Sequence, residues 1–305
     1  MTTEQYFKNL NTPTGKVDVV LDTDTYNEID DQFALAYMLR SQDKLNIKGI
    51  CAAPFLNNLS SSAADGMEKS YKEIHKVLRL VGETNMSHLV MKGSTSFLKD
   101  EKTPVISDSA QFLAEFSEQY SPEKPLYIIA IGAITNVASA ILLNPNMKEN
   151  TVVVWLGGHA FHRNNTREFN MFQDVAAARV VFNSGVPLVM LPCCGVVDQF
   201  TTTKYELEHW LLGKNELCDY LTNNTIEYME IHAKYPTWSK VIWDVTAVAW
   251  LLNDKKQFMN DRLEHCPIPE YDNYYAYDHS RPMIQYVYNI NRDALFADLF
   301  DKLSR

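Results

Sequence analysis

Residues 17–32 read VDVVLDTDTYNEIDDQ, and this stretch joins a strand pattern to a helix pattern. Residues 17–21 are a short apolar run rich in β-branched side chains, which predicts a buried strand. The helix predicted over residues 30–40 begins with two carboxylates, where the helix dipole favours negative charge. A buried strand followed directly by a helix is the first unit of an α/β fold.

The same alternation continues to about residue 200. Further strands are predicted over residues 45–53, 89–93, 125–131, 151–156 and 187–191, separated by helices over residues 60–82, 107–120, 134–143 and 174–183. Near-continuous apolar strands joined by helices predict right-handed crossovers and a mostly parallel, Rossmann-like sheet with helices on both faces.

The last third of the chain has a different pattern. It is helix-rich from about residue 200, and a strand-like run over residues 283–290 and a helix from Asp293 close it. We therefore expect one α/β domain over residues 1–305, with an N-terminal extension over residues 1–16 and a helical elaboration over about residues 200–240.

Composition excludes several classes of protein. The 305 residues carry 28 Lys and Arg against 38 Asp and Glu, a net charge of −10, which argues against a nucleic-acid groove or binding to an anionic membrane. No apolar run is long enough for a transmembrane helix, and the first residues lack a signal-peptide pattern. The five cysteines are scattered and form no CxxC pair, so we expect reduced thiols and a cytoplasmic location.

Polar residues follow the predicted strands where they end. Ligands of an open parallel sheet bind in the crevice beyond these carboxyl ends. The residues that follow four of the strands are Asp22 and Asp24, Asn57 and Asn58, the segment 132–136, and the glycines 157–158 with the polar loop to Asn170. The sequence therefore predicts a site at this edge of the sheet.

Four aspartates fall within ten residues: Asp22, Asp24, Asp30 and Asp31. Like charges held close together repel strongly unless a cation neutralises them or one takes up a proton. All-oxygen ligands favour a hard cation such as Ca²⁺ or Mg²⁺. The alternative is that Asp30 and Asp31 only cap a helix and that the other two are solvated turn residues.

Asp244 stands alone among apolar residues, in the run VIWDVTAVAW over residues 241–250. It fits the N-cap of the helix that follows, and its alternative role is a distant metal ligand in the same crevice. Trp243 beside it fits core packing, or an aromatic wall against a flat ligand.

Four motifs together resemble the inosine–uridine-preferring nucleoside hydrolases. They are the aspartate-rich stretch, IGAITNVASA (131–140), WLGGHA (155–160) with EFNMFQDVAAARVVF (168–182), and WDVTAVAW (243–250), in that family's order. The resemblance implies the nucleoside hydrolase fold and a Ca²⁺-dependent enzyme that cleaves a ribonucleoside to a free base and ribose. It also implies a homodimer or homotetramer.

The resemblance further implies a role for each matching residue. Asp24, Asp31, Asp244 and the backbone carbonyl of Ile131 would bind calcium, with Asp24 also the base that activates water. Asp30 would hold a ribose hydroxyl, Glu168 and Asn170 the 5′ end of the ribose, and Asp22 would support the loop. Asn57 and Asn164 complete the expected substrate contacts, with Asn165 as the alternative to Asn164.

Three departures from the family pattern stand out. The aspartate motif is two residues longer between Asp24 and Asp30, and the extra residues include Asn27 and Glu28. The segment after Gly158 lacks the usual Gly-Asn placement. Trp243 replaces the histidine acid of some members, as in a purine-preferring subgroup where tryptophan stacks on the base.

The leaving base still needs stabilisation. Trp243 could stack on it but is a poor acid, and His159, His162 and His279 are alternative proton donors. Two other functions remain open: a nucleoside- or sugar-binding protein without hydrolysis, and a haloacid-dehalogenase-like phosphatase using Asp22 and Asp24. The phosphatase also needs a late acidic pair after a strand, which the sequence lacks.

Overall fold

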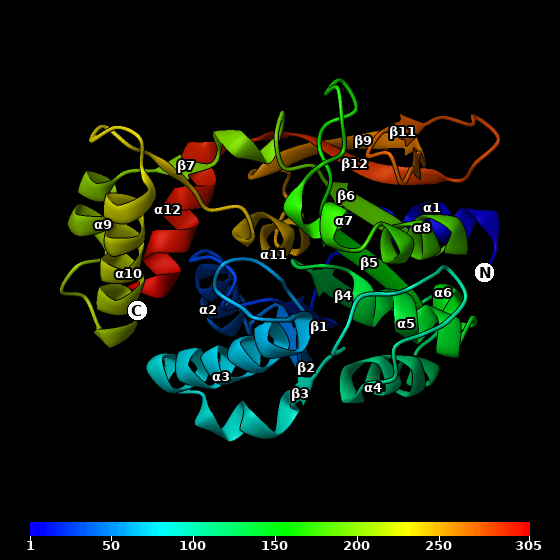
Figure 1. The fold of residues 1–305 in the computed structure, drawn as a ribbon, viewed down its shortest axis with the longest axis horizontal. Coiled ribbons are helices and arrows are strands. Elements are labelled where there is room, and N and C mark those ends of the chain that lie inside the picture. The colour runs from blue at the N-terminus through cyan, green and yellow to red at the C-terminus, as the bar shows by residue number, and fades with distance from the viewer.

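The computed structural model describes residues 1–305 and is organised around one eight-stranded sheet (Figure 1). In spatial order its strands are β3 (Val90–Lys92), β2 (Leu45–Ala52), β1 (Val17–Thr23), β4 (Leu126–Ala130), β5 (Thr151–Leu156), β6 (Leu188–Leu191), β12 (Met283–Ile290) and β9 (Met259–His265). Every neighbouring pair is parallel except β12 and β9. The prediction of a mostly parallel sheet is confirmed.

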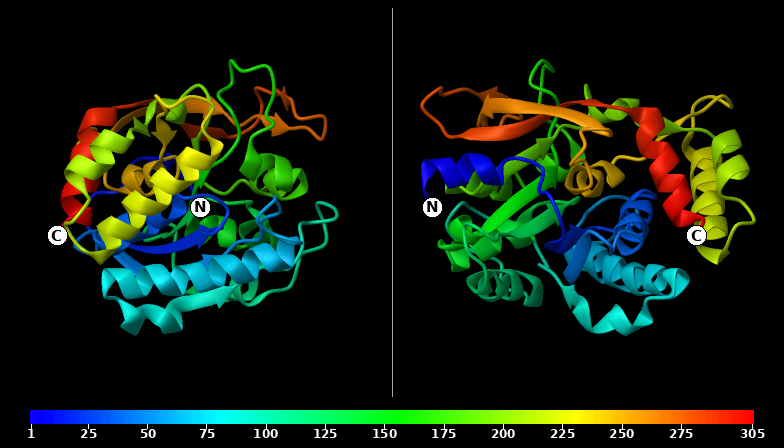
Figure 2. Two further views of the ribbon diagram at one scale, coloured as in Figure 1. Left: turned by 60° about the vertical axis from the view of Figure 1, so that its left-hand side comes forward. Right: turned by 180° about the vertical axis from the view of Figure 1, so that it is seen from behind.

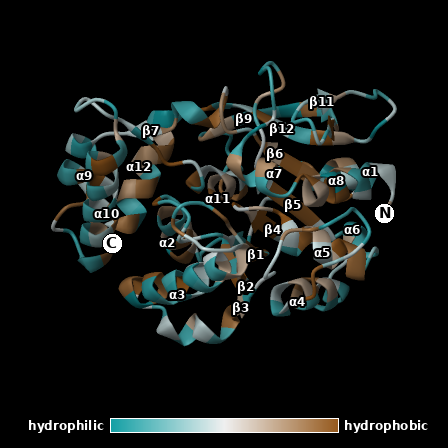
Figure 3. Cartoon of the chain, in the orientation of Figure 1, coloured by the Kyte–Doolittle hydropathy of each residue, from teal (hydrophilic) through white to brown (hydrophobic).

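Helices cover both faces of the sheet. One apolar cluster packs α2 (Asp31–Leu39), α3 (Ala63–Val81), α11 (Val245–Leu251) and α12 (Arg292–Leu303) against strand residues such as Leu21. The other packs α4 (Asp108–Phe116), α5 (Thr135–Leu143) and α8 (Val175–Ser184) against residues such as Val20. Because successive strand residues face opposite sides, each buried strand supplies both clusters. Figure 3 shows the apolar strands enclosed by helices whose outer surfaces are more polar.

Local signals in the sequence set the ends of the predicted helices. Ser62 caps α3 by accepting a 3.1 Å hydrogen bond from the backbone N–H of Asp65, and Gly82 ends this helix with a φ of +87°. Asp174 caps α8 in the same way, and Gly185 ends it. Only glycine adopts such positive φ values without strain, so these residues stop the helices where the sequence predicts.

Several elements were not predicted. They are α1 (Thr3–Asn9), η1 (Thr84–Leu89), α6 (Met147–Asn150), α7 (Phe169–Gln173), η3 (Val197–Gln199), the pair β7 (Thr201–Thr202) and β8 (Lys240–Val241), strand β9, and the pair β10 (Ile268–Pro269) and β11 (Tyr275–Ala276). The helix predicted over residues 107–120 is divided into α4 and the short η2 (Ser117–Gln119). The expectation of a helix-rich segment up to residue 283 is therefore wrong over residues 259–276. Strand β9 forms the antiparallel edge of the main sheet, and β10 and β11 form a separate two-stranded sheet. Residues 1–16, expected as an extension, contain α1.

Two helices form the expected elaboration between residues 200 and 240. They are α9 (Lys204–Trp210) and α10 (Glu216–His232), which pack together and against α12 and α3 at one end of the molecule (Figure 2). None of the helices has the length and apolar character needed to span a bilayer.

Candidate active site

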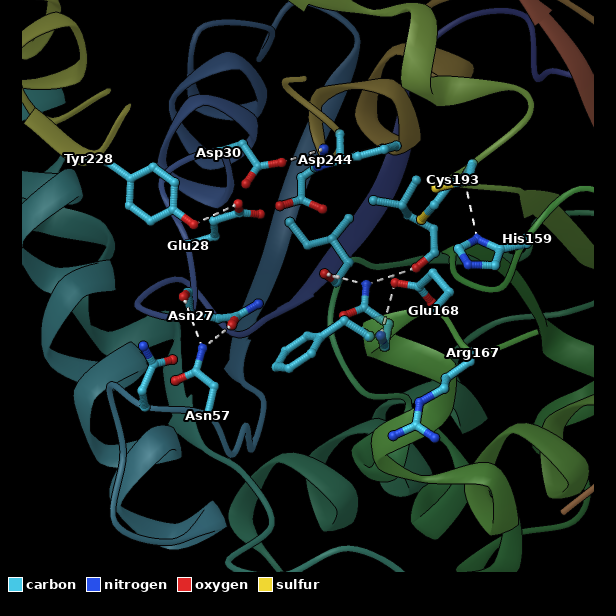
Figure 4. Close-up of a pocket in the computed structure, with 17 residues that line it drawn as sticks. Asn27, Glu28, Asp30, Asn57, His159, Arg167, Glu168, Cys193, Tyr228 and Asp244 are labelled. Atoms are coloured by element: carbon cyan, nitrogen blue, oxygen red, sulfur yellow. Dashed lines mark hydrogen bonds between the residues drawn. The ribbon is translucent and has the colours of Figure 1, made fainter. Parts of the chain in front are cut away.

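A cavity of about 450 Å³ opens at the carboxyl ends of the central strands. Its floor includes Ile131 directly after β4, Leu156 at the end of β5 and Cys193 just after β6. Figure 4 shows two facing walls, one with Asn27, Glu28, Asn57 and Tyr228 and the other with His159, Arg167, Glu168 and Cys193. Asp30 and Asp244 lie between these walls. The cavity therefore lies at the edge of the sheet where the sequence predicts a site.

Three carboxylates converge at this position. Oxygen atoms of Asp30, Asp31 and Asp244 lie within 4.8 Å of one another, and all three residues are buried. Asp30 and Asp244 occupy the N-cap positions of α2 and α11, but neither side chain caps its helix. The interpretation of these two side chains as helix caps is wrong: both carboxylates turn away from the helix ends and towards each other's loop.

Asp24 lies beside this cluster without lining the cavity. It is fully buried, and neither of its carboxylate oxygens has a hydrogen-bond partner. A Cβ added at Gly132 would lie 3.0 Å from the Asp24 carboxyl carbon, so the glycine leaves just enough room for it. A buried charge without a partner is costly, which is typical of a site built for a bound ion.

Asp22 is anchored by the segment that follows β4. Its Oδ1 accepts a 2.7 Å hydrogen bond from Asn136 Nδ2, while its Oδ2 has no partner. Asn136 is itself held by Ser94, whose backbone N–H and hydroxyl both donate to the Asn136 carbonyl at 2.8 Å. Through Asn136, Asp22 is thus linked to the segment after β3 as well as to α5.

Burial raises the pKa of every carboxyl group in the cluster. It raises the pKa of Asp22 and of Asp30 to about 7 and that of Asp31 to about 6. Burial, reinforced by neighbouring carboxylates, raises the pKa of Asp24 and of Asp244 well above the usual range. Thr23 partly offsets the effect at Asp31 by donating a 2.5 Å hydrogen bond to it. Each shift opposes ionisation, and a divalent cation would reverse it.

The residues present fit a hard divalent cation. The donor set is all oxygen, the unpartnered Asp24 oxygens need a cationic partner, and Asp31 and Asp244 bring a second and a third carboxylate. Ile131 lines the same cavity, and its carbonyl accepts a hydrogen bond from Asn170 Nδ2. The carboxylates that the structure brings together for an ion are those of Asp30, Asp31 and Asp244. Of the other two ligands expected from the resemblance, Asp24 lies close to this group and Ile131 lines the same cavity.

Glu168 and Asn170 shape the opposite wall. The Glu168 carboxylate caps α7 and accepts backbone hydrogen bonds from Gly158 at 2.8 Å, Asn170 at 2.9 Å and Met171 at 3.0 Å. The Asn170 Nδ2 donates to the carbonyls of Ile131 at 3.1 Å and Leu156 at 3.0 Å. Asn170 therefore ties the ends of β4 and β5 together and directs its own carbonyl oxygen away from both.

The remaining predicted residues are divided between the cavity and other places. Asn57, Trp243 and His159 line the cavity. His162 and His279 line a different cavity with Arg262 and Glu264. Asn164 and Asn165 are exposed, and neither lines the active-site cavity. Of the three histidines, the structure brings only His159 to the site, and burial lowers its pKa.

Several residues that line the cavity were not predicted as substrate contacts. They are Asn58, Arg167, Phe169, Cys193, Cys194 and Tyr228. Asn27 and Glu28 also line the cavity, although the sequence marked them only as extra loop residues. Glu28 contacts Tyr228 and Lys240, which lie far from it in the sequence, and no local sequence pattern indicates these contacts.

Comparison with known proteins gives a consistent result. A family model described as inosine-uridine preferring nucleoside hydrolase matches residues 19–296. A pyrimidine-specific ribonucleoside hydrolase from Shewanella sp. (strain MR-4) is 26% identical over 233 residues, which are 66% of this chain and 71% of the relative. A probable uridine nucleosidase from Arabidopsis thaliana is 27% identical over 144 residues, 46% of this chain and 44% of the relative.

Solved structures match over nearly the whole chain. A purine-preferring ribonucleoside hydrolase from Gardnerella vaginalis has a TM-score of 0.74 at 20% identity, covering 94% of this chain and 98% of that one. An inosine-guanosine nucleoside hydrolase also has a TM-score of 0.74, at 15% identity, covering 94% and 98%. These structures share the fold, while the bases named for the relatives differ.

Proposed function

The chain belongs to the family of inosine-uridine preferring nucleoside hydrolases, and on that premise we propose that it hydrolyses ribonucleosides at a Ca²⁺ site with Asp24 as the general base. The observation that carries the proposal is the convergence of Asp30, Asp31 and Asp244 beside the unpartnered carboxylate of Asp24. Because the chain belongs to this family, it is a ribonucleoside hydrolase, and the alternative hypothesis of a DxD-type phosphatase is excluded.

The ion would be held by Asp24, Asp31, Asp244 and the Ile131 carbonyl. When bound, Ca²⁺ lowers the pKa of a coordinated water and orients the hydroxyls of the sugar. No protein donor occupies either oxygen of Asp24, so its carboxylate is free to bind the ion and to accept a proton. Asp24 takes the proton of the attacking water as the oxygen bonds to C1′ of the ribose.

The other residues position the sugar and stabilise its charge. The glycosidic bond breaks through a transition state with positive charge on the ribose, and the clustered carboxylates stabilise that charge. Asp30 accepts a hydrogen bond from a ribose hydroxyl, and Glu168 and Asn170 border the 5′ end. Holding the sugar in this way supplies part of the rate acceleration.

The bond electrons move to the leaving nitrogen of the base, which then takes up a proton. Trp243 lines the cavity next to Asp244 and is half-buried against the apolar core, so its ring presents a fixed surface on which a base can stack. A purine offers the larger stacking area, and we propose a purine preference on this ground.

A panel of ribonucleosides, assayed for reducing sugar with and without chelator, tests the proposal. Release of ribose that stops with chelator and returns with Ca²⁺ is the expected result. Calorimetry that shows nucleoside binding without any release of base would favour the alternative of a binding protein. The homodimer or homotetramer and the cytoplasmic location stay predictions, and sedimentation of the purified protein tests the first of these.

A further inference from the structure

Glu28 places a carboxylate on the wall of the cavity opposite Glu168 (Figure 4). Its side chain is 30% exposed, and its Oε1 accepts two hydrogen bonds. One comes from Lys240 Nζ at 2.8 Å and the other from the Tyr228 hydroxyl at 3.1 Å. Lys240 is nearly fully buried, with 7% of its side chain exposed.

This pairing fixes what Glu28 can offer a ligand. Both donors bind the same oxygen, so the second oxygen, Oε2, accepts no hydrogen bond from the protein. Lys240 and Glu28 form a salt bridge, in which the carboxylate is the anion. An ionised carboxylate only accepts hydrogen bonds. Glu28 therefore presents one free acceptor, and no donor, to the cavity.

The side of the cavity that meets the base follows from the proposed function, on which this inference rests. Glu168 and Asn170 take one wall for the sugar, and the carboxylates between the walls take its hydroxyls. A cavity of about 450 Å³ lies in the range of small-molecule sites, so the base also fits inside it. The wall left for the base is that of Glu28 and Tyr228.

We propose that Glu28 is a specificity-determining residue that selects bases carrying an exocyclic amino group. The amino group of adenine or cytosine donates a hydrogen bond to the free oxygen of Glu28. Hypoxanthine and uracil carry a keto oxygen in its place, which is an acceptor. The keto oxygen and the carboxylate oxygen of Glu28 repel each other, and neither receives a hydrogen bond from the other. The difference applies to purines and pyrimidines alike.

Two matched pairs of substrates measure this preference. Adenosine and inosine differ at position 6, and cytidine and uridine at position 4, in each case by an amino group against a keto oxygen. A hydrogen bond to a charged group supports discrimination of about tenfold or more. We expect kcat/KM to favour the amino member of each pair by that factor.

The variant Glu28→Gln makes the test sharper. Lys240 and Tyr228 both donate, so they retain the carboxamide oxygen and turn the Gln NH₂ group towards the cavity. The wall then offers a donor instead of an acceptor. We expect the preference to reverse in favour of inosine and uridine, whereas a merely structural role for Glu28 would lower both members of a pair equally.

Glu73 supplies a matched control. Its carboxylate accepts a hydrogen bond from the Tyr220 hydroxyl and lies 3.6 Å from Lys76 Nζ, but it does not line the cavity. Glu73→Gln thus changes the same chemistry elsewhere, and we expect the substrate ratios to stay as in the unchanged protein.

Calorimetry with free adenine and free hypoxanthine on the unchanged protein gives a readout that needs neither turnover nor a variant. Tighter binding of adenine supports the inference even if no nucleoside is cleaved, in which case only the proposed function fails. Equal or tighter binding of hypoxanthine overturns it. A Glu28→Gln variant that hydrolyses nucleosides with the unchanged amino-to-keto ratio also overturns it.

Discussion

The backbone N–H of Asp244 donates a 3.4 Å hydrogen bond to the carboxylate of Asp30, 214 residues earlier in the chain. This contact joins the loop before α2 to the loop before α11, and those two helices pack side by side. The carboxylates of Asp31 and Asp244 come together at the same place. The packing of two apolar helices thus holds the clustered carboxylates in register.

The first prediction concerns Asp24. We expect Asp24→Asn to lower hydrolysis of p-nitrophenyl riboside by at least about 100-fold, since a general base typically contributes that much. We also expect the metal-free variant to melt at a higher temperature than the unchanged protein, because a buried charge without a partner has been removed. Activity within tenfold of the unchanged protein would contradict the role of Asp24.

Asp174 is the matched control for Asp24, because it is also buried but fully paired. Its oxygens accept from the backbone of Leu98 at 2.9 Å, the hydroxyl of Thr135 at 2.7 Å and the backbone of Ala177 at 2.9 Å. Asp174→Asn should therefore lower the free energy of unfolding by about 1–3 kcal/mol. Opposite shifts in melting temperature for the two variants are the expected outcome.

The second prediction concerns pH in the absence of metal. The pKa values of Asp22 and Asp30 rise from 3.8 in the unfolded chain to about 7 in the folded protein. Between about pH 4 and 7 the folded protein therefore binds more protons than the unfolded chain, and these groups make the free energy of unfolding fall as the pH rises. With chelator present, we expect the melting temperature to be lower at pH 8 than at pH 5.

Calcium and a variant of Asp22 separate this effect from other titrations. Ca²⁺ at pH 8 should raise the melting temperature, since it binds the folded protein and neutralises the carboxylates. Asp22→Asn, which keeps an acceptor for Asn136, should reduce the loss of stability between pH 5 and 8. The same pH slope in Asp22→Asn as in the unchanged protein would show that Asp22 does not titrate in this window.

The third prediction concerns Gly132. A Cβ at this position would lie 3.0 Å from the Asp24 carboxyl group and 3.2 Å from Ala53 Cβ, so it would displace Asp24. Small displacements of a catalytic group are costly, and we expect Gly132→Ala to lower kcat by about tenfold to 100-fold. Gly49→Ala is the control, because its Cβ would clash with Phe112 and Met91, which do not line the cavity. It should reduce stability without this loss of kcat. Equal kcat for both variants would count against the close fit at Asp24.

The fourth prediction concerns Trp243. If its ring stacks on the base, Trp243→Ala should lower kcat/KM for purine ribonucleosides more than for pyrimidine ribonucleosides. A stacked base contributes about 1–3 kcal/mol, so the loss for purines should be about tenfold to 100-fold. Trp210, which is 52% exposed on α9, provides the control Trp210→Ala. Equal losses for the two substrate classes would remove the basis for a purine preference.

Local sequence patterns were sufficient for the parallel part of the fold. Apolar runs identified β1 through β6, and Ser62, Gly82 and Asp174 marked helix ends that the structure reproduces. Strand β9 was missed because its sequence, MNDRLEH, is polar and only one of its residues, Met259, is buried at one edge of the sheet. Such a strand is stabilised by its pairing with β12, which no local pattern reveals.

The aspartate cluster of the site could also be predicted from the sequence, but the cavity wall that contains Glu28 could not. The aspartates follow a strand directly, so the rule for open sheets locates them. For Asp244 the residues alone left a helix cap and a metal ligand open, and only the packing of α11 beside α2 decides where its carboxylate lies. The position of the Glu28 carboxylate likewise depends on contacts with residues far along the chain, because Tyr228 and Lys240 both donate hydrogen bonds to it.

The separation of 214 residues between Asp30 and Asp244 also has a consequence during protein synthesis. A ribosome adding roughly 5–20 residues per second needs about 10 to 40 s to travel between the two codons. Throughout that interval the aspartates near the N-terminus lack Asp244, so the nascent chain has only part of the carboxylate cluster. The active centre is completed only after most of the polypeptide has left the ribosome, and fragments from interrupted translation lack it.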